Sequence, residues 1–216
     1  MVIDDNLEVW AAHFPATLVP QVIQLVLDSW KTFRTIQTDE VKITQEFHVV
    51  LNRNQKLSKL PFIIDPETTL FNENGTEQIG RLDLRIIHGY IREVYFSFEC
   101  KRLRWEFPGG QFDPLSGVYV TDGMYRYFNG QYATDLDKGG MLGYVMDGNC
   151  NKAVKDVQKA IEKRRLNLYM QENETLKASL SIVSKQVKET LHKYGPNEKF
   201  IIYHIFLPMN ATPNTN

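Results

Sequence analysis

Cysteine is scarce in this sequence, which contains two, Cys100 and Cys150, among 216 residues. Two cysteines are too few for a disulfide-stabilised secreted domain and fit a reducing compartment. The first residues lack the basic and apolar regions of a secretory signal, and no apolar run approaches the roughly 18 residues that a membrane helix needs. We therefore expect a cytoplasmic protein that does not associate with a membrane.

An excess of charge of either sign is also absent. Lys and Arg number 25 against 26 Asp and Glu, a net charge of −1, so a nucleic-acid partner would need a local basic patch. Apolar residues, by contrast, make up 43% of the chain, which excludes a disordered protein and fits one core. We expect a single domain over residues 1–208, with N-terminal helices in 1–54 and a core in 60–208, followed by a polar, disordered tail over 209–216.

The motifs of three common enzyme classes are missing. The sequence has no Gly-x-Ser-x-Gly segment, and its five histidines show no zinc-like spacing. Residues 75–81 have the glycine frame of a P-loop but Arg-Leu where Lys and Ser or Thr are required. Acyl transfer, zinc chemistry and P-loop nucleotide chemistry are therefore unsupported.

Hydrophobic periodicity predicts helices around a central sheet. Apolar residues at helical spacing predict helices over 18–30 and 39–54, the second capped by Thr38 or Asp39. Period-two alternation predicts strands over 80–88 and 91–102, which are close enough in sequence to form an antiparallel hairpin. This order predicts an α/β fold with a central mixed β-sheet flanked by helices on both faces. Further expected elements are a strand at 62–64, a short helix over 122–128, a strand over 141–145, a helix over 151–169 and a last strand over 199–207, with 176–194 ambiguous.

The two strands of the predicted hairpin carry charged side chains that can meet. Asp83 lies on the first strand, and Glu99 and Lys101 lie two residues apart on the second, so they project from the same face. A second acidic-x-Lys triplet occurs at 40–42, but on a predicted helix, where residues two apart point in different directions. The hairpin therefore predicts a cluster of Asp83, Glu99 and Lys101.

Such a cluster suits a metal-dependent hydrolase. Two neighbouring carboxylates repel each other, and a divalent cation relieves the repulsion; hard oxygen ligands suit Mg²⁺ or Mn²⁺. The ion polarises a phosphate oxygen and acidifies a bound water, which a nearby lysine can orient or deprotonate for attack on phosphorus. The three residues thus point to hydrolysis of a phosphodiester.

The segments Gly80-Arg-Leu-Asp83 and Tyr95-Phe-Ser-Phe-Glu99-Cys-Lys101 resemble the core motif of the PD-(D/E)xK nuclease superfamily. The resemblance implies a restriction-endonuclease-like fold and Mg²⁺-dependent cleavage of nucleic acid, with a DNA endonuclease favoured over an enzyme acting on RNA. It also implies that Asp83 and Glu99 bind the metal, that Lys101 assists the hydrolytic water, and that Glu46 on the preceding helix completes the site. Leu82 stands where the superfamily has its name-giving proline. The other acidic residues that could take the place of Glu46 are Glu40, Glu67, Glu73 and Glu77.

Two other interpretations stay open at this point. The same fold could serve as a catalytically inactive module that binds nucleic acid or protein. Alternatively, the charged residues form cross-strand ion pairs, Asp83 with Arg81 or Arg85 and Glu99 with Lys101. The small size and the lack of a separate recognition domain favour a homodimer or a protein partner.

Basic residues outside the cluster indicate where a nucleic acid would bind. Arg102 and Arg104 follow the triplet and could either contact the scissile phosphate or cap the strand end. Arg126 stands among aromatic residues, a combination that either stacks bases or packs in a core. A basic stripe on the helix predicted over 151–169 could follow phosphates or form a solvated helix face. The stripe consists of Lys152, Lys155, Lys159 and Lys163.

Overall fold

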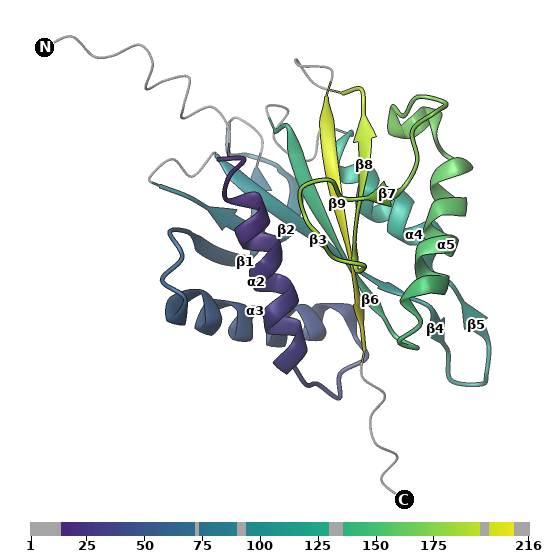
Figure 1. Ribbon diagram of the computed structural model, residues 1–216, viewed down its shortest axis with the longest axis horizontal. Helices are drawn as coiled ribbons and strands as arrows, with labels where there is room; N and C mark the ends of the chain where they lie inside the picture. The colour runs from purple at the N-terminus through teal and green to yellow at the C-terminus, as the bar shows by residue number, and fades with distance from the viewer. Residues whose placement is uncertain (1–13, 72–73, 90–93, 130–135, 195–198, 210–216) are drawn as a thin grey trace, which may run out of the picture.

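A mixed seven-stranded sheet forms the centre of the computed structural model, which describes residues 14–71, 74–89, 94–129, 136–194 and 199–209. The strand order is β1-β2-β3-β6-β9-β8-β7, and a separate small sheet pairs β4 with β5 (Figure 1). The first three strands are antiparallel, β6 and β9 are parallel to β3, and β8 and β7 return antiparallel. The predicted α/β fold with a mixed sheet is confirmed. The strands are β1 (Ile63–Phe71), β2 (Gln78–Ile87), β3 (Tyr95–Leu103), β4 (Trp105–Glu106), β5 (Phe112–Asp113), β6 (Lys138–Val145), β7 (Lys177–Ala178), β8 (Val187–His192) and β9 (Phe200–Pro208).

Helices cover both faces of this sheet, and each face has its own hydrophobic core. On one face, α2 and α3 bury residues such as Trp30 and Phe47 against Phe96 and Phe98 of β3. On the other, α5 and the irregular helix before β6 bury residues such as Val157 against the same strands. The helices are α2 (Val19–Thr32), α3 (Glu40–Leu57), α4 (Ser116–Val118), the π-helix η1 (Tyr119–Gly123), the 3-10 helix η2 (Met124–Tyr127), α5 (Cys150–Glu162) and the 3-10 helix η3 (Leu166–Leu168).

The start of α3 agrees with the predicted helix over 39–54. Asp39 has an extended backbone and its side chain accepts a hydrogen bond of 3.1 Å from the N–H of Lys42, so it is the N-cap. The helix continues three residues beyond the predicted end, to Leu57. Its first turn, which carries Glu40, lies beside β3, as the bond between Glu40 and the N–H of Arg102 shows.

The C-terminal helix and the short helix before β6 differ from expectation. α5 ends at Glu162, seven residues before the predicted end, because Arg165 turns to donate to the carbonyls of Gln171 and Glu174 and Tyr169 adopts a left-handed backbone with φ 54°. The helix predicted over 122–128 is a π-helix followed by a 3-10 turn. In the ambiguous segment 176–194 the structure forms β7 and β8.

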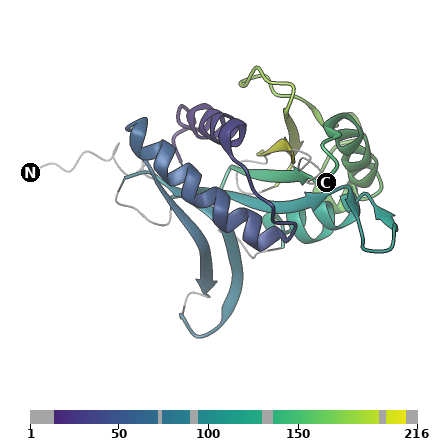
Figure 2. The same cartoon turned by 90° about the horizontal axis from the view of Figure 1, so that it is seen from below.

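The β1–β2 hairpin extends beyond the region in which β2 pairs with β3. β2 pairs with β1 over most of its length but with β3 only from Leu84 to Ile87. The outer part of the hairpin therefore projects from the body of the molecule as a two-stranded arm (Figure 2). The point at which β2 leaves β3 is where Asp83 lies.

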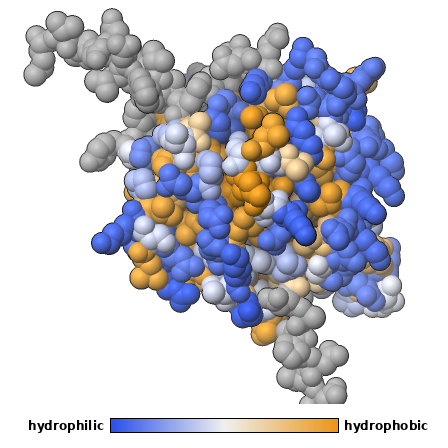
Figure 3. Space-filling view, in the orientation of Figure 1, coloured by the Kyte–Doolittle hydropathy of each residue, from blue (hydrophilic) through white to orange (hydrophobic). Residues whose placement is uncertain are grey.

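The surface in the view of Figure 1 is mostly polar, with apolar side chains gathered near its centre (Figure 3). Leu180 and Val183, between β7 and β8, are among the exposed apolar residues of the chain. The expected homodimer or protein partner stays a prediction.

In the described part of the chain, no helix has both the length and the hydropathy required to cross a bilayer. The expected tail over 209–216 lies, apart from Met209, outside the described residues.

Candidate functional site

A polar cavity of about 270 Å³ opens where β2 separates from β3. Its wall combines the first turn of α3, the base of the β1–β2 arm, β3 and η2. Both carboxylates and cations line it, in contrast to the apolar cores on either side. The lining residues are Glu40, Val41, Thr44, Glu67, Gln78, Gly80, Arg81, Asp83, Lys101 and Arg126.

Asp83 creates the separation between the two strands. Main-chain pairing of β2 with β3 stops at Leu84 and Phe98. One residue further, the Asp83 side chain replaces a main-chain acceptor: its Oδ2 accepts a hydrogen bond of 2.7 Å from the N–H of Cys100. The carboxylate thus satisfies a strand N–H that would otherwise be unpaired, and it lies against β3 beside Glu99 and Lys101.

Lys101 is held by three acceptors at once. Its Nζ donates to Glu99 Oε1 at 2.7 Å, to the carbonyl of Cys100 at 2.9 Å and to Glu40 Oε1 at 3.2 Å. Three donated bonds use all the hydrogens of an ammonium group and leave no lone pair. Burial lowers the pKa of Lys101. The negative charges of Glu99, Glu40 and Asp83 raise it by more than burial lowers it, so the pKa of Lys101 is above the ordinary value of a lysine. Lys101 is therefore a protonated hydrogen-bond donor.

Glu99 is fully buried and lies between two cations. Its Oε1 contacts Lys101 Nζ at 2.7 Å and Arg126 Nη1 at 2.8 Å. Burial and the negative charge of Asp83 raise the pKa of Glu99 to about 7, although Lys101 and Arg126 act in the opposite direction. The repulsion between Asp83 and Glu99 is the kind that a bound divalent cation relieves.

Helix α3 contributes Glu40 to this site, and Glu46 lies elsewhere. Glu40 Oε1 contacts Lys101, and its Oε2 accepts a hydrogen bond of 2.7 Å from the N–H of Arg102. The carboxylate of Glu46 instead accepts from Thr35 Oγ1 at 2.5 Å and Gln37 Nε2 at 3.1 Å. Six residues along a helix correspond to about 600°, so the two side chains point in different directions. The sequence-based assignment of Glu46 to the site is therefore wrong, and Glu40, one of the four alternatives, takes its place beside Lys101.

Among the arginines proposed from the sequence, Arg126 alone lines the cavity. The next residue, Tyr127, fixes η2 to the sheet: its hydroxyl lies 2.8 Å from the carbonyl of Gly140 and 3.1 Å from that of Ser97, and it donates its one hydrogen to either of them. The Tyr127 ring packs directly over Gly139, where a Cβ would overlap it, so the glycine is required for this contact. No local pattern in the sequence predicts these contacts between η2 and the sheet.

Arg104 does not contact the cavity, contrary to its proposed role at the scissile phosphate. Its side chain is buried, with Nε 2.8 Å from Asp147 and Nη1 2.5 Å from Asp156. Arg102 donates from Nη1 to the carbonyl of Thr38 at 2.8 Å, so its guanidinium lies outside the cavity wall. The four lysines of the basic stripe are all exposed, three on α5 and Lys163 at its C-cap, and none of them lines the cavity.

The expected cross-strand ion pairs are present only in part. Lys101 does pair with Glu99, but Arg85 pairs with Asp65 at 3.1 Å and Arg81 approaches Glu67 at 4.0 Å. Asp83 takes part in no ion pair within 4.0 Å among the described residues. Its position beside two other carboxylates is therefore not explained by a partner arginine.

The donors that a metal ion would need are carboxylate oxygens, and their chemistry suits Mg²⁺ or Mn²⁺. Asp83 and Glu99 supply them from neighbouring strands, and Glu40 bonds to the same Lys101 Nζ as Glu99 does. Over the ranges that the structure describes, no group of three or more His, Cys, Asp or Glu side chains is close enough to hold a metal as it stands. A two-carboxylate site completed by water and a substrate phosphate fits these residues, because Mg²⁺ keeps most of its waters.

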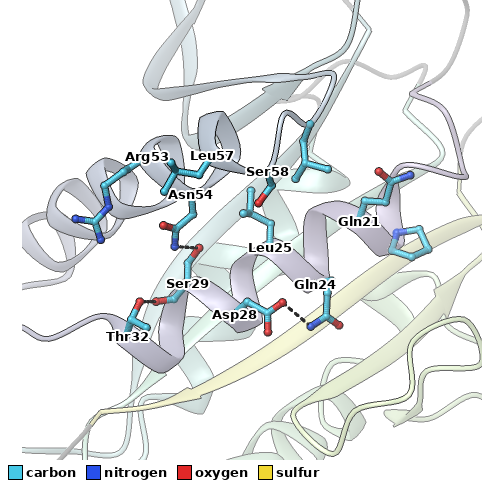
Figure 4. Close-up of a pocket in the computed structure, with 12 residues that line it drawn as sticks. Gln21, Gln24, Leu25, Asp28, Ser29, Thr32, Arg53, Asn54, Leu57 and Ser58 are labelled. Carbon is cyan, nitrogen blue, oxygen red and sulfur yellow. Dashed lines mark hydrogen bonds between the residues drawn. The ribbon is translucent and has the colours of Figure 1, made fainter.

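A larger hollow, of about 850 Å³, lies between α2 and α3 (Figure 4). Its wall includes Leu25 and Leu57, and two of its polar groups bond to each other: Asn54 Nδ2 donates to Ser29 Oγ at 3.0 Å. It lacks a cluster of carboxylates with a cation. The reactive groups are therefore at the smaller cavity.

Comparisons of this chain with protein-family models, with curated proteins and with solved structures find no match. Function must therefore be inferred from the residues themselves. The candidate residues are Asp83, Glu99, Lys101, Glu40 and Arg126.

Proposed function

We propose that this protein hydrolyses phosphodiester bonds in nucleic acid with a divalent metal ion, Mg²⁺ or Mn²⁺, and that DNA is its favoured substrate. One observation carries the proposal: Asp83 and Lys101 from adjacent strands and Glu40 from the preceding helix line one cavity, and the buried Glu99 bonds to Lys101 directly behind its wall. This arrangement agrees with the set of residues that the resemblance to PD-(D/E)xK nucleases implies, with Glu40 in place of Glu46. The mixed sheet between two helical layers is compatible with a restriction-endonuclease-like fold.

Asp83 and Glu99 are the residues that would hold the metal. When bound, a divalent ion supplies a Lewis acid for a phosphate oxygen and lowers the pKa of water. The carboxylate of Asp83 is oriented for this task by the N–H of Cys100, and Glu99 is fixed by burial in β3. Asp83 is thus preorganised, whereas Glu99 would have to exchange a contact with Lys101 or Arg126 for the ion.

Lys101 acts as a hydrogen-bond donor. Because its three hydrogens are engaged, it does not remove a proton from water in this state. It orients the attacking water or a phosphate oxygen by exchanging one of its carboxylate contacts for the substrate. Arg126, which has a third of its side chain exposed, supplies positive charge at the cavity wall as negative charge develops on phosphorus.

A cleavage assay tests the proposal. The purified protein is incubated with plasmid DNA, single-stranded DNA and RNA in the presence of Mg²⁺, Mn²⁺ or EDTA. The variants are Asp83→Asn and Lys101→Ala, with Glu46→Gln, purified in the same way, as the matched control. We expect cleavage that needs the metal, falls about 100-fold or more in the two site variants and is unchanged in the control. Absence of cleavage under every condition, or equal cleavage by Asp83→Asn, would overturn the proposal.

A second candidate function is a catalytically inactive module that binds nucleic acid. The observation that favours it is the closed network around Glu99, whose Oε1 is already bound by Lys101 and Arg126. Such a module would bind nucleic acid with or without metal and would leave it intact. The same assay, run with a binding measurement on the same samples, distinguishes the two functions.

A further inference from the structure

The β4–β5 hairpin presents aromatic side chains to solvent. Phe107 is 38% exposed and Phe112 is 47% exposed, and Trp105 is partly exposed. None of the three belongs to either hydrophobic core in the described part of the chain. Figure 1 shows the hairpin at the edge of the molecule, beyond the end of β3. Exposing rings in this way costs hydration free energy and is typical of a binding surface.

Trp105 and Phe107 form one side of this hairpin. They are two residues apart, so on a strand they share a face, and their rings meet edge to face with centroids 6.3 Å apart. The guanidinium of Arg102 lies over the Trp105 ring at 5.4 Å. Glu106, between them in sequence, has the opposite orientation along the strand. The result is a short row of a cation and two rings.

The base of the hairpin is rigid. Arg104 turns the chain out of β3 with a left-handed φ of 58°, and its N–H donates to the carbonyl of Pro114 at 3.0 Å. Its side chain is fixed by Asp147 and by Asp156 of α5. The structural role of Arg104 is therefore to hold the aromatic row in place next to α5.

The row also starts next to the proposed site. Arg102 follows Lys101 directly, and its N–H is bonded to Glu40 Oε2. On the other side, the contact of Arg104 with Asp156 brings the hairpin beside α5, whose exposed face carries the lysine stripe. Positive charge from Arg102 therefore lies directly against the Trp105 ring, and the helix that contacts the base of the hairpin carries further lysines, which suits a phosphate backbone with stacked bases.

We propose that Trp105, Phe107 and Arg102 form a stacking platform for single-stranded nucleic acid that leads to the proposed site. The inference rests on the proposed function for the identity of the ligand. Aromatic faces bind unpaired bases irrespective of sequence, and the bases of an intact duplex do not expose their faces. A single strand, or a locally opened one, is thus the substrate class that this surface fits.

A binding measurement without metal tests the platform. Fluorescein-labelled oligothymidylate and oligouridylate of about 20 nucleotides, and a duplex of the same length, are titrated with protein in EDTA and followed by anisotropy. The variants are Trp105→Ala and Phe107→Ala, with Trp105→Phe to restore a ring. Leu57→Ala, which removes exposed apolar surface on α3, is the matched control.

We expect single strands to bind more tightly than the duplex and each alanine variant to weaken this binding about fivefold or more. Trp105→Phe should recover most of the affinity, and Leu57→Ala should match the parent protein. Unchanged binding by both alanine variants, a preference for duplex, or no binding to any oligonucleotide would overturn the inference; the last result would indicate a protein ligand for this surface.

The two proposals can fail separately. If the protein cleaves nucleic acid with a metal but the Trp105→Ala and Phe107→Ala variants bind oligonucleotides as the parent does, the stacking platform is wrong and the hydrolytic function stands. If the two alanine variants lose binding and no metal condition gives cleavage, the stacking platform stands and the hydrolytic function is wrong.

Discussion

Asp83 Oδ2 accepts a 2.7 Å hydrogen bond from the main-chain N–H of Cys100, at the point where β2 leaves β3. This one contact gives Asp83 two roles. It completes the hydrogen bonding of a buried strand, and it holds a carboxylate beside Glu99, whose pKa it helps to raise.

Two substitutions of Asp83 distinguish its role as a hydrogen-bond acceptor from its role as a negative charge. Asp83→Asn keeps an acceptor for the Cys100 N–H and removes a charge that repels Glu99 but attracts Lys101, so we expect the free energy of unfolding to change by less than about 1 kcal/mol. Asp83→Ala leaves the N–H unpaired and should cost about 1–3 kcal/mol. Urea denaturation of both variants measures the difference. Equal stability of the two variants would show that the hydrogen bond contributes little.

Glu40 and Glu46 provide a matched pair on one helix. Glu40→Gln removes the negative charge beside Lys101 and leaves one accepting oxygen where the carboxylate uses two, for Lys101 and for the N–H of Arg102, so we expect nuclease activity to fall about tenfold or more. Glu46→Gln alters contacts with Thr35 and Gln37 only and should retain the parent activity. Initial rates of cleavage under identical metal conditions make the comparison. A larger loss of activity in Glu46→Gln than in Glu40→Gln would indicate that Glu46, as the sequence alone suggested, is the third carboxylate of the site.

The difference between these two glutamates shows how far the sequence could predict the site. Strand alternation correctly placed Asp83, Glu99 and Lys101 together, because the positions depend on local periodicity and a short hairpin. Which face of α3 meets β3 depends on packing between distant segments, so Glu40 was not chosen. Arg126 reaches Glu99 only because Tyr127 bonds to Ser97 and Gly140, and no local pattern encodes these contacts.

The fold, like the site, was predictable where local periodicity determines it and not where packing between distant segments does. Long periodic segments such as α3 and β9 were predictable, whereas 176–194 carries too few regularly spaced apolar residues to identify β7 and β8. The helix predicted over 122–128 is part of a longer irregular helical segment that starts after Leu115, whose φ is a left-handed 52°, and runs through α4, η1 and η2. Its irregular form places Arg126.

Two buried histidines should make stability depend on pH. His192 Nδ1 donates to the carbonyl of Leu168, so its Nε2 accepts from the Thr190 hydroxyl; Thr190 Oγ1 in turn accepts from His204 Nε2, and His204 Nδ1 accepts from Tyr119. Both rings are neutral in this chain. Burial lowers the pKa of His192 to about 4 and that of His204 to about 3.

Because both pKa values are lowered, the unfolded chain takes up protons below about pH 6.5 while the folded chain does not. Stability should therefore fall as the pH falls, by about 2 kcal/mol for each histidine between pH 6.5 and 5. Glu99, with its raised pKa, acts in the opposite direction over this range. Denaturation curves at several pH values, for the parent and for His204→Gln, measure the slope. The variant should show a shallower slope, and an unchanged slope would mean that the pKa of His204 is the same in the folded and the unfolded chain.

Metal binding at Asp83 and Glu99 is the central claim, and calorimetric titration with Mn²⁺ tests it most directly. We expect the parent protein to bind Mn²⁺ saturably, Glu46→Gln to bind it with the same affinity, and Asp83→Asn to lose about tenfold or more in affinity. No saturable binding by the parent protein, or equal binding by Asp83→Asn, would contradict the account.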